Sequence, residues 1–137
     1  MNFWLFKSEP DAWSWEQQVA RGDAGEEWTG VRNYQARNNM RSMKVGDQGF
    51  FYHSNEGKEV VGIVEVIRES QPDSTTDDPR WDCVVIKALS PLKTPVTLET
   101  CKVTGGLEEM VLVKNTRLSV QPVTKAEWDI ICRLGGL

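Results

Sequence analysis

One stretch of the chain combines residue types that suit contact with a nucleotide. Between Gly30 and Lys44 the sequence carries four cations and neither Asp nor Glu. Trp28 and Tyr34 add flat aromatic rings on which a base can stack, while cations attract the phosphate of a nucleotide. These residue types point to a site for a phosphate and a base. The cations are Arg32, Arg37, Arg41 and Lys44.

A loop and the helix that follows it must position these side chains. Asn33 can cap the first turn of this helix, and Ala36 and Met40 recur at the spacing of one buried helical face. The free N–H groups at a helix N-terminus carry partial positive charge, so the cations beside them would form an anion-binding corner.

The net charge limits how nucleic acid could bind. The whole chain carries a formal charge of −4, and the segment Gly30–Lys44 carries +4, so the other residues carry −8. Proteins that bind phosphates without sequence preference are usually basic overall. We therefore expect weak binding in bulk, mainly through this one patch.

The remaining sequence predicts an α+β fold with a barrel-like sheet, because several strand patterns are interleaved with short helices without regular alternation. Ser14 with Gln17, and Thr124 with Glu127, have the spacing of capping boxes that open helices. The expected strands are Asn2–Phe6, Phe50–Ser54, Val60–Ile67, Trp81–Leu89 and Leu118–Val123. The expected helices are Trp15–Ala20, the helix capped by Asn33 with Ala36, Met40 and Met43 on its buried face, Val96–Lys102 and a C-terminal helix after Thr124.

Loops and breaks complete this prediction. The segment Gln71–Pro79 contains Pro, Ser, Thr and Asp and is predicted to be a solvated loop, and Pro91 and Pro95 are predicted to break the chain after the fourth strand. With 137 residues the chain has the length of one domain, so we expect a single domain over residues 1–137.

The cysteines and the hydropathy indicate a reducing, aqueous compartment. Cys83, Cys101 and Cys132 are too scattered for a disulfide framework, and no Cys or His spacing indicates zinc, so neither a metal nor another cofactor is expected. No apolar run approaches membrane-spanning length, and the N-terminus lacks the features of a signal peptide. A cytoplasmic protein without a membrane partner is the prediction. The oligomeric state stays open, with a monomer as the simplest expectation.

Several motifs in the same order along the chain resemble the EVE domain, including the thymocyte nuclear protein family of eukaryotes. The resemblance spans nearly the whole sequence. The departure is a brief Gln71–Pro79 loop, where longer relatives insert more residues. The motifs are Lys7-Ser8-Glu9-Pro10-Asp11, Trp28-x-Gly30-Val31-Arg32-Asn33-Tyr34-Gln35-Ala36-Arg37-Asn38, Phe51-Tyr52-His53-Ser54, Gly62-Ile63 with Glu65-Val66, Pro79-Arg80-Trp81, and Arg117-Leu118-Ser119-Val120-Gln121-Pro122-Val123.

The resemblance implies a PUA-like mixed β-barrel with helices packed outside, related to YTH and ASCH domains. It also implies a non-catalytic reader of a modified base, chiefly 5-methylcytosine or an oxidised form in DNA. A reader must extract the base and hold it between flat walls. The implied pocket residues are Lys7, Ser8, Trp28, Val31, Asn33, Tyr34, Phe51, Tyr52, His53, Ser54, Ser119, Gln121 and Pro122, and the implied phosphate contacts are Lys7, Arg32, Arg37 and Arg41.

Each of these residues also has a purely structural interpretation. Trp28 and one of Phe51 or Tyr52 are the candidate walls, although Trp28 could be a core residue. Asn33 could read a base edge or cap the helix, and His53, the one histidine, is more typical of a structural hydrogen bond than of catalysis. Trp4, Trp81, Trp128 and the cysteines are predicted to be core, and Trp13 and Trp15 are left undecided.

Three other functions remain as alternatives. The first is a reader of a modified base in RNA. The second is a small enzyme acting on a modified nucleotide, for which the sequence shows no metal-ligand cluster, positioned nucleophile or phosphate loop. The third is a module that binds a methylated side chain in an aromatic cage, which is disfavoured because the cations of Gly30–Lys44 would repel such a ligand.

Overall fold

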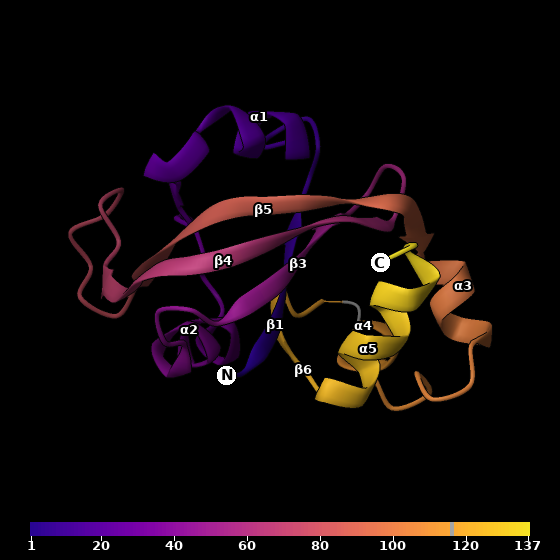
Figure 1. Ribbon diagram of the computed structural model, residues 1–137. Helices are drawn as coiled ribbons and strands as arrows, with labels where there is room; N and C mark the ends of the chain where they lie inside the picture. The colour runs from indigo at the N-terminus through magenta and orange to yellow at the C-terminus, as the bar shows by residue number, and fades with distance from the viewer. Residues whose placement is uncertain (116) are drawn as a thin grey trace.

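The computed structural model describes residues 1–115 and 117–137. Six strands within this part form one mixed sheet in the order β2-β5-β4-β3-β1-β6, with short helices packed around it (Figure 1). β1 runs parallel to β3, and the other strand pairs are antiparallel. The strands are β1 (Phe3–Ser8), β2 (Glu26–Glu27), β3 (Gln48–His53), β4 (Glu59–Pro72), β5 (Asp82–Thr97) and β6 (Val120–Val123). The helices are α1 (Trp15–Ala20), the short 3-10 helix η1 (Gly22–Ala24), α2 (Tyr34–Ser42), α3 (Leu98–Val103), α4 (Val111–Lys114) and α5 (Lys125–Leu134).

The two long strands β4 and β5 differ most from the prediction. The expected break at Pro91 and Pro95 is wrong, because β5 continues through both prolines. β2 pairs with β5 only at Val85 and Ile86, so further along β5 has one edge without a described neighbour, where proline costs no ladder hydrogen bond. The register between β4 and β5 also shifts at several β-bulges, which bend long strands.

Two smaller differences between the predicted and observed ends of elements also involve β4 and β5. β4 extends to Pro72, so the predicted loop Gln71–Pro79 begins inside a strand. Val96 is a buried strand residue, and the expected helix therefore begins at Leu98. α1 has the predicted bounds, and both predicted capping boxes are confirmed.

The strands bury side chains on both faces of the sheet. Side chains alternate along a strand, and Phe6 and Phe51 belong to one core while Leu5 and Phe50 belong to the other. All four are fully buried. The dense aromatic runs in β1 and β3 thus reflect strands covered on both sides, rather than a strand with one solvated face.

One helix and several loops cover the first face. α2 begins where the sequence predicts, because the Asn33 side-chain oxygen accepts a hydrogen bond from the Ala36 N–H at 2.9 Å. Ala36, Met40 and Met43 are buried against the sheet, as predicted from their spacing. α1 with the segment before it, and the segment from β2 to α2, also cover this face.

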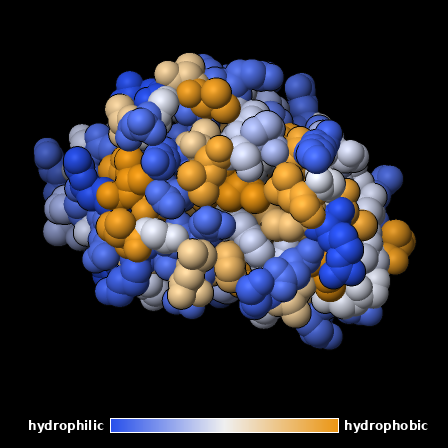
Figure 2. Space-filling view, in the orientation of Figure 1, coloured by the Kyte–Doolittle hydropathy of each residue, from blue (hydrophilic) through white to orange (hydrophobic). Residues whose placement is uncertain are grey.

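Helices α3, α4 and α5 lie on the other face, grouped near the C-terminus (Figure 1). Trp128 of α5 is buried and stacks on Phe3 at 4.4 Å and on Phe50 at 4.0 Å between ring centroids. In the same orientation, apolar side chains form a broken band across the middle of the surface, with hydrophilic side chains between them (Figure 2).

Candidate functional site

A cavity of about 410 Å³ opens on the face that α2 covers only in part. It lies where the end of β1, the segment before α1, the segment from β2 to α2 and the residue before β6 meet. Its volume falls within the range of small-ligand pockets, roughly 300–1,000 Å³. The lining residues are Lys7, Ser8, Ala12, Trp13, Glu26, Glu27, Trp28, Thr29, Gly30, Val31, Arg32 and Ser119.

Two indole rings belong to this lining, and both are fixed in place. Trp28 is 9% exposed and packs edge-on against Phe6 and Phe51, with centroid distances of 5.4 and 5.8 Å. Trp13 donates from its indole N–H to Gln18 at 3.0 Å, and the fully buried Gln18 donates to the Ile86 carbonyl at 3.0 Å. Trp28 is therefore both a core residue and a cavity residue, and Trp13 is anchored to the sheet.

Ser8 ties the segment before α1 to the end of β1. Its hydroxyl donates to the Trp13 carbonyl, and its own carbonyl accepts from the Ser54 N–H at 2.8 Å. Ser8 is buried, so this hydroxyl holds the cavity wall in position.

Asp73 fixes the loop on the opposite side of the cavity. Its carboxylate accepts from the Gly30 N–H at 2.9 Å, from Arg32 Nη1 at 3.1 Å and from Thr75. Burial alone would raise the pKa of Asp73, but the hydrogen bonds from Thr75, Gly30 and Arg32 outweigh it and lower the pKa to about 2. The sequence analysis did not predict a role for Asp73, because the whole segment Gln71–Pro79 was predicted to be a solvated loop. The spacing of Asp73 and Thr75 is nevertheless that of an Asx turn.

Ion pairs with aspartates from distant parts of the sequence reduce the positive charge expected around the site. Arg32 pairs with Asp73 and Arg41 with Asp82, so two of the predicted phosphate contacts already have acidic partners. Arg37 forms no ion pair within residues 1–115 and 117–137; it donates to the Arg80 carbonyl at 3.0 Å and to Asn38. The sequence showed no acid near these cations because the acids lie some forty residues further along the chain.

Tyr34 lies outside the cavity. Its ring is 50% exposed and stacks on the buried Trp81 with centroids 5.0 Å apart. The guanidinium of Arg37 lies 4.9 Å from the Tyr34 centroid, and that of Arg32 lies 5.7 Å from the Trp81 centroid. An exposed cation and aromatic surface therefore adjoins the cavity through Arg32.

The predicted residues of β3 do not line the cavity. Phe51 is fully buried behind Trp28, and Tyr52 belongs to the opposite core, where burial and the nearby Cys101 raise its pKa to about 12. Lys7 lines the cavity, but its ammonium lies 5.9 Å from the Tyr52 ring centroid. Ser54 follows β3 and is likewise outside the lining.

Three further predicted residues have structural partners. His53 accepts a hydrogen bond from the Trp15 N–H at 3.1 Å, and burial lowers the His53 pKa although Glu16 and Glu59 lie nearby. Asn33 caps α2, and the buried Gln121 donates to the Leu118 carbonyl at 2.8 Å. Pro122 lines a different cavity. Val31 and Ser119 do line the site, as does Thr29, which was not predicted.

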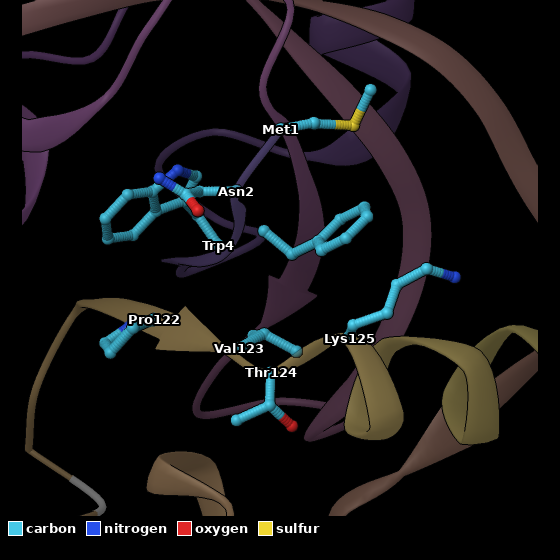
Figure 3. Close-up of a pocket in the computed structure, with 8 residues that line it drawn as sticks. Met1, Asn2, Trp4, Pro122, Val123, Thr124 and Lys125 are labelled. Carbon is cyan, nitrogen blue, oxygen red and sulfur yellow. The ribbon is translucent and has the colours of Figure 1, made fainter.

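The second cavity, about 790 Å³, lies beside the N-terminus. Trp4, Pro122, Val123 and Lys125 surround it, coming from β1, β6 and the start of α5 (Figure 3). The indole N–H of Trp4 is already used, because it donates to Asp47 at 3.0 Å. This largely apolar groove offers a base fewer polar partners than the cavity beside Trp13 and Trp28.

No group of three or more His, Cys, Asp or Glu in the part of the chain that the structure describes could hold a metal ion. No helix formed by residues 1–115 and 117–137 is long and apolar enough to cross a membrane.

Comparison with known proteins places the chain in a family. Thymocyte nuclear protein 1 of Mus musculus is 38% identical over 97% of this chain and 73% of its own length. A crystal structure from Agrobacterium tumefaciens is 62% identical, with a TM-score of 0.99 over 100% of this chain and 94% of that one. Human THYN1, solved in complex with DNA containing 5-methylcytosine, is 34% identical, with a TM-score of 0.92 over 100% of this chain and 99% of that one.

The fold also resembles that of more distant proteins. A YTH domain from Zygosaccharomyces rouxii has a TM-score of 0.59 at 17% identity over 98% of this chain and 86% of that one, which supports the relation between the folds alone. The model of the EVE domain family matches residues 2–134. The chain therefore belongs to the EVE domain family.

Proposed function

We propose that this protein is a non-catalytic reader of a modified base, most readily 5-methylcytosine or an oxidised derivative in DNA, and that the base enters the cavity beside Trp13 and Trp28. The observation that carries the proposal is this aromatic cavity, found in a chain that matches human THYN1 over its whole length, a protein solved with DNA containing 5-methylcytosine.

The geometry suits a base that has left its stack. Such a base needs flat apolar surface for its faces and polar groups for its edge. Trp13 and Trp28 supply aromatic surface held by the sheet, and Glu26, Ser8 and Thr29 supply polar atoms in the same lining. Fixed walls lower the cost of ordering the site when the base binds.

The size of each contribution sets what the cavity can discriminate. Stacking is worth about 1–3 kcal/mol per base and helps every base, so it determines affinity more than preference. Burying one methyl group contributes about 0.8 kcal/mol, roughly a fourfold preference over cytosine. A hydroxymethyl or carboxyl group that meets a matched polar partner can gain more, because an unpaired buried polar group is costly.

The surface around Tyr34 and Arg37 would contact the flanking strand. Arg37 has no acidic partner among the described residues, so its charge is available to a phosphate, whereas Arg32 and Arg41 would have to share theirs with aspartates. We assign phosphate binding mainly to Arg37. This charge distribution predicts weak, salt-sensitive binding, as expected for a chain with a net charge of −4.

The lining favours binding over catalysis. It contains neither histidine nor cysteine, and His53, the one histidine of the sequence, is bound to the backbone of Trp15. The Ser8 hydroxyl is fixed in a structural hydrogen bond to the Trp13 carbonyl.

Fluorescence polarisation tests the proposal directly. Labelled duplexes that differ at one position, carrying cytosine, 5-methylcytosine or 5-hydroxymethylcytosine, are titrated at fixed salt with wild type, Trp13→Ala and Tyr34→Ala. We expect tighter binding to a modified duplex. We expect Trp13→Ala to abolish that preference and to weaken binding about 5- to 150-fold, the value of one stacking contact.

Tyr34→Ala is the matched control, because it removes an aromatic ring outside the cavity. It should weaken binding to all duplexes by the same factor and leave the preference unchanged. Equal binding of wild type to every duplex, or a preference that survives Trp13→Ala in a folded protein, would contradict the assignment.

A further inference from the structure

We propose that Glu26 accepts a hydrogen bond from the exocyclic amino group of the bound base, so that the cavity selects 5-methylcytosine over thymine. This inference rests on the proposed function and names the group that reads the base edge. The aromatic walls alone cannot distinguish 5-methylcytosine from thymine.

The chemical problem is specific. Thymine and 5-methylcytosine carry the same methyl group and offer the same ring faces for stacking, so neither the walls nor a methyl contact can separate them. At position 4 cytosine presents an N–H₂ donor, whereas thymine presents a carbonyl acceptor. A carboxylate can only accept hydrogen bonds, so it binds the amino group of cytosine and repels the carbonyl oxygen of thymine.

The strand geometry distinguishes Glu26 from its neighbour. Glu26 pairs with Ile86 and Glu27 with Val85, and the Trp28 N–H continues this ladder by donating to the Val84 carbonyl at 2.8 Å. Both glutamates belong to the cavity lining, but side chains alternate along an extended segment, so Glu26 shares the face of Trp28 and Glu27 points to the opposite face.

The contacts of the two carboxylates agree with this alternation. Glu27 Oε2 accepts from Gln71 Nε2 at 3.4 Å and from the Cys83 thiol at 3.6 Å, so it is already used inside the protein. Glu26 has no hydrogen bond in the described chain, and its side chain is 33% exposed at the cavity. Of the two, Glu26 has oxygen atoms to offer a ligand.

An arginine holds the Glu26 carboxylate in place. Arg21 Nε lies 3.3 Å from Glu26 Oε1, and the same nitrogen donates to the Gly25 carbonyl at 2.8 Å. Arg21 thus contacts one oxygen and leaves Oε2 for the base. A carboxylate fixed in this way loses little conformational freedom when it binds.

The test compares a variant inside the cavity with one outside it. Duplexes with 5-methylcytosine or thymine opposite an abasic site, where pairing with the other strand does not enter, are titrated with wild type, Glu26→Gln and Glu99→Gln. Glu99 lies in the first turn of α3 and outside the cavity lining, and each substitution removes one negative charge, so both change the net charge equally. Thermal unfolding of all three proteins confirms that they are folded.

Wild type should bind 5-methylcytosine on the order of tenfold more tightly than thymine, the value of one charge-assisted hydrogen bond. Glu26→Gln should bring the ratio close to one and increase thymine binding, because an amide can donate to a carbonyl as well as accept from an amine. Glu99→Gln should keep the wild-type ratio.

The outcomes separate this inference from the proposed function. A preference for 5-methylcytosine over thymine that Glu26→Gln leaves unchanged, or that Glu99→Gln removes as well, would overturn the role of Glu26 while the reader function stands. Equal binding of cytosine and 5-methylcytosine by wild type would overturn the proposed function and this inference with it.

Discussion

The two faces of the sheet bury aromatic side chains from the same strands, yet they differ in what covers them. On the face of α3, α4 and α5, Trp128 stacks on Phe3 and on Phe50 and is 6% exposed. On the other face α2 and the short helix α1 cover only part of the sheet, and loops anchored by single side chains cover the rest. The cavity opens among these loops.

The comparison shows that the segment packed over a tryptophan, more than the residues next to it in the sequence, determines whether its ring can contact a ligand. A ring sealed by a helix can stabilise the fold alone, whereas one held by a loop keeps an edge for a ligand. Trp28 illustrates the second case, because its ring packs on Phe6 and Phe51 and still lines the cavity. We call the face of α3, α4 and α5 the sealed face and the face with the cavity the loop-covered face. Substitutions on the sealed face should therefore change stability, whereas substitutions on the loop-covered face should also change binding.

The largest effect is expected from Trp128→Ala on the sealed face. Removing a buried ring that stacks on two others should lower the free energy of unfolding by about 3–5 kcal/mol in urea denaturation. The molecules that remain folded should keep the preference among modified bases. A loss below about 1 kcal/mol would contradict the sealed packing inferred for this face.

Gly62→Ala should disturb the loop-covered face through Trp15. A Cβ at Gly62 would lie 2.4 Å from the Trp15 ring, whose rigid atoms cannot give way easily. We expect the free energy of unfolding to fall by about 3 kcal/mol, the upper part of the range for overpacking. Because Trp15 follows Trp13 closely, base binding should weaken as well; intact binding would show that the cavity wall is independent of α1.

Asp73→Asn tests the anchor of the cavity loop by its pH dependence. The pKa of Asp73 is about 2 in the folded protein against 3.8 for an ordinary Asp, so the carboxylate stabilises the fold by about 2 kcal/mol at neutral pH. Because the folded pKa is the lower one, this contribution is complete above pH 4 and is lost as the pH falls toward 2. The stability difference between wild type and Asp73→Asn should shrink over that window.

Asp77→Asn provides the control for this measurement, since Asp77 is an exposed residue of the same loop. Its stability should stay within about 0.5 kcal/mol of wild type at neutral pH. A difference for Asp73→Asn that does not change between pH 4 and 2 would show that the carboxylate charge is not what holds the loop.

The smallest effect is expected from Arg37→Gln. Losing one phosphate contact should reduce the slope of log affinity against log salt by about one and weaken binding to all sequences equally. Lys102→Gln removes the same charge from α3, on the other face, and should leave the slope unchanged. Equal slopes for both variants would place the phosphate contact elsewhere.

The sequence predicted the local features of this fold well. Capping side chains act within a few residues, so the starts of α1, α2 and α5 could be predicted from Ser14, Asn33 and Thr124. The mixed sheet was also predicted. The course of β5 through Pro91 was not, because it depends on which edge of the strand has a neighbour.

The candidate site depends more on contacts between distant segments. Lys7, Ser8, Trp28, Val31 and Ser119 were predicted and line one cavity, although their role in binding stays a prediction. Trp13 was left undecided because its anchor, Gln18, shows no pattern in sequence. The pairing of Arg32 with Asp73 and of Arg41 with Asp82 could not be predicted either, since it requires the loop after β4 to lie beside α2.

The central claim is that a modified base binds beside Trp13 and Trp28, and the indole N–H signals of the six tryptophans test it in one ¹⁵N-resolved NMR titration. A DNA oligonucleotide containing 5-methylcytosine is added, with the unmodified oligonucleotide as reference. We predict that the signals of Trp13 and Trp28 shift, and shift further with the modified base, while Trp4 and Trp128 stay in place. Shifts of Trp4 or Trp128 with Trp13 and Trp28 unmoved would place the ligand in the N-terminal cavity or on the sealed face and contradict the account.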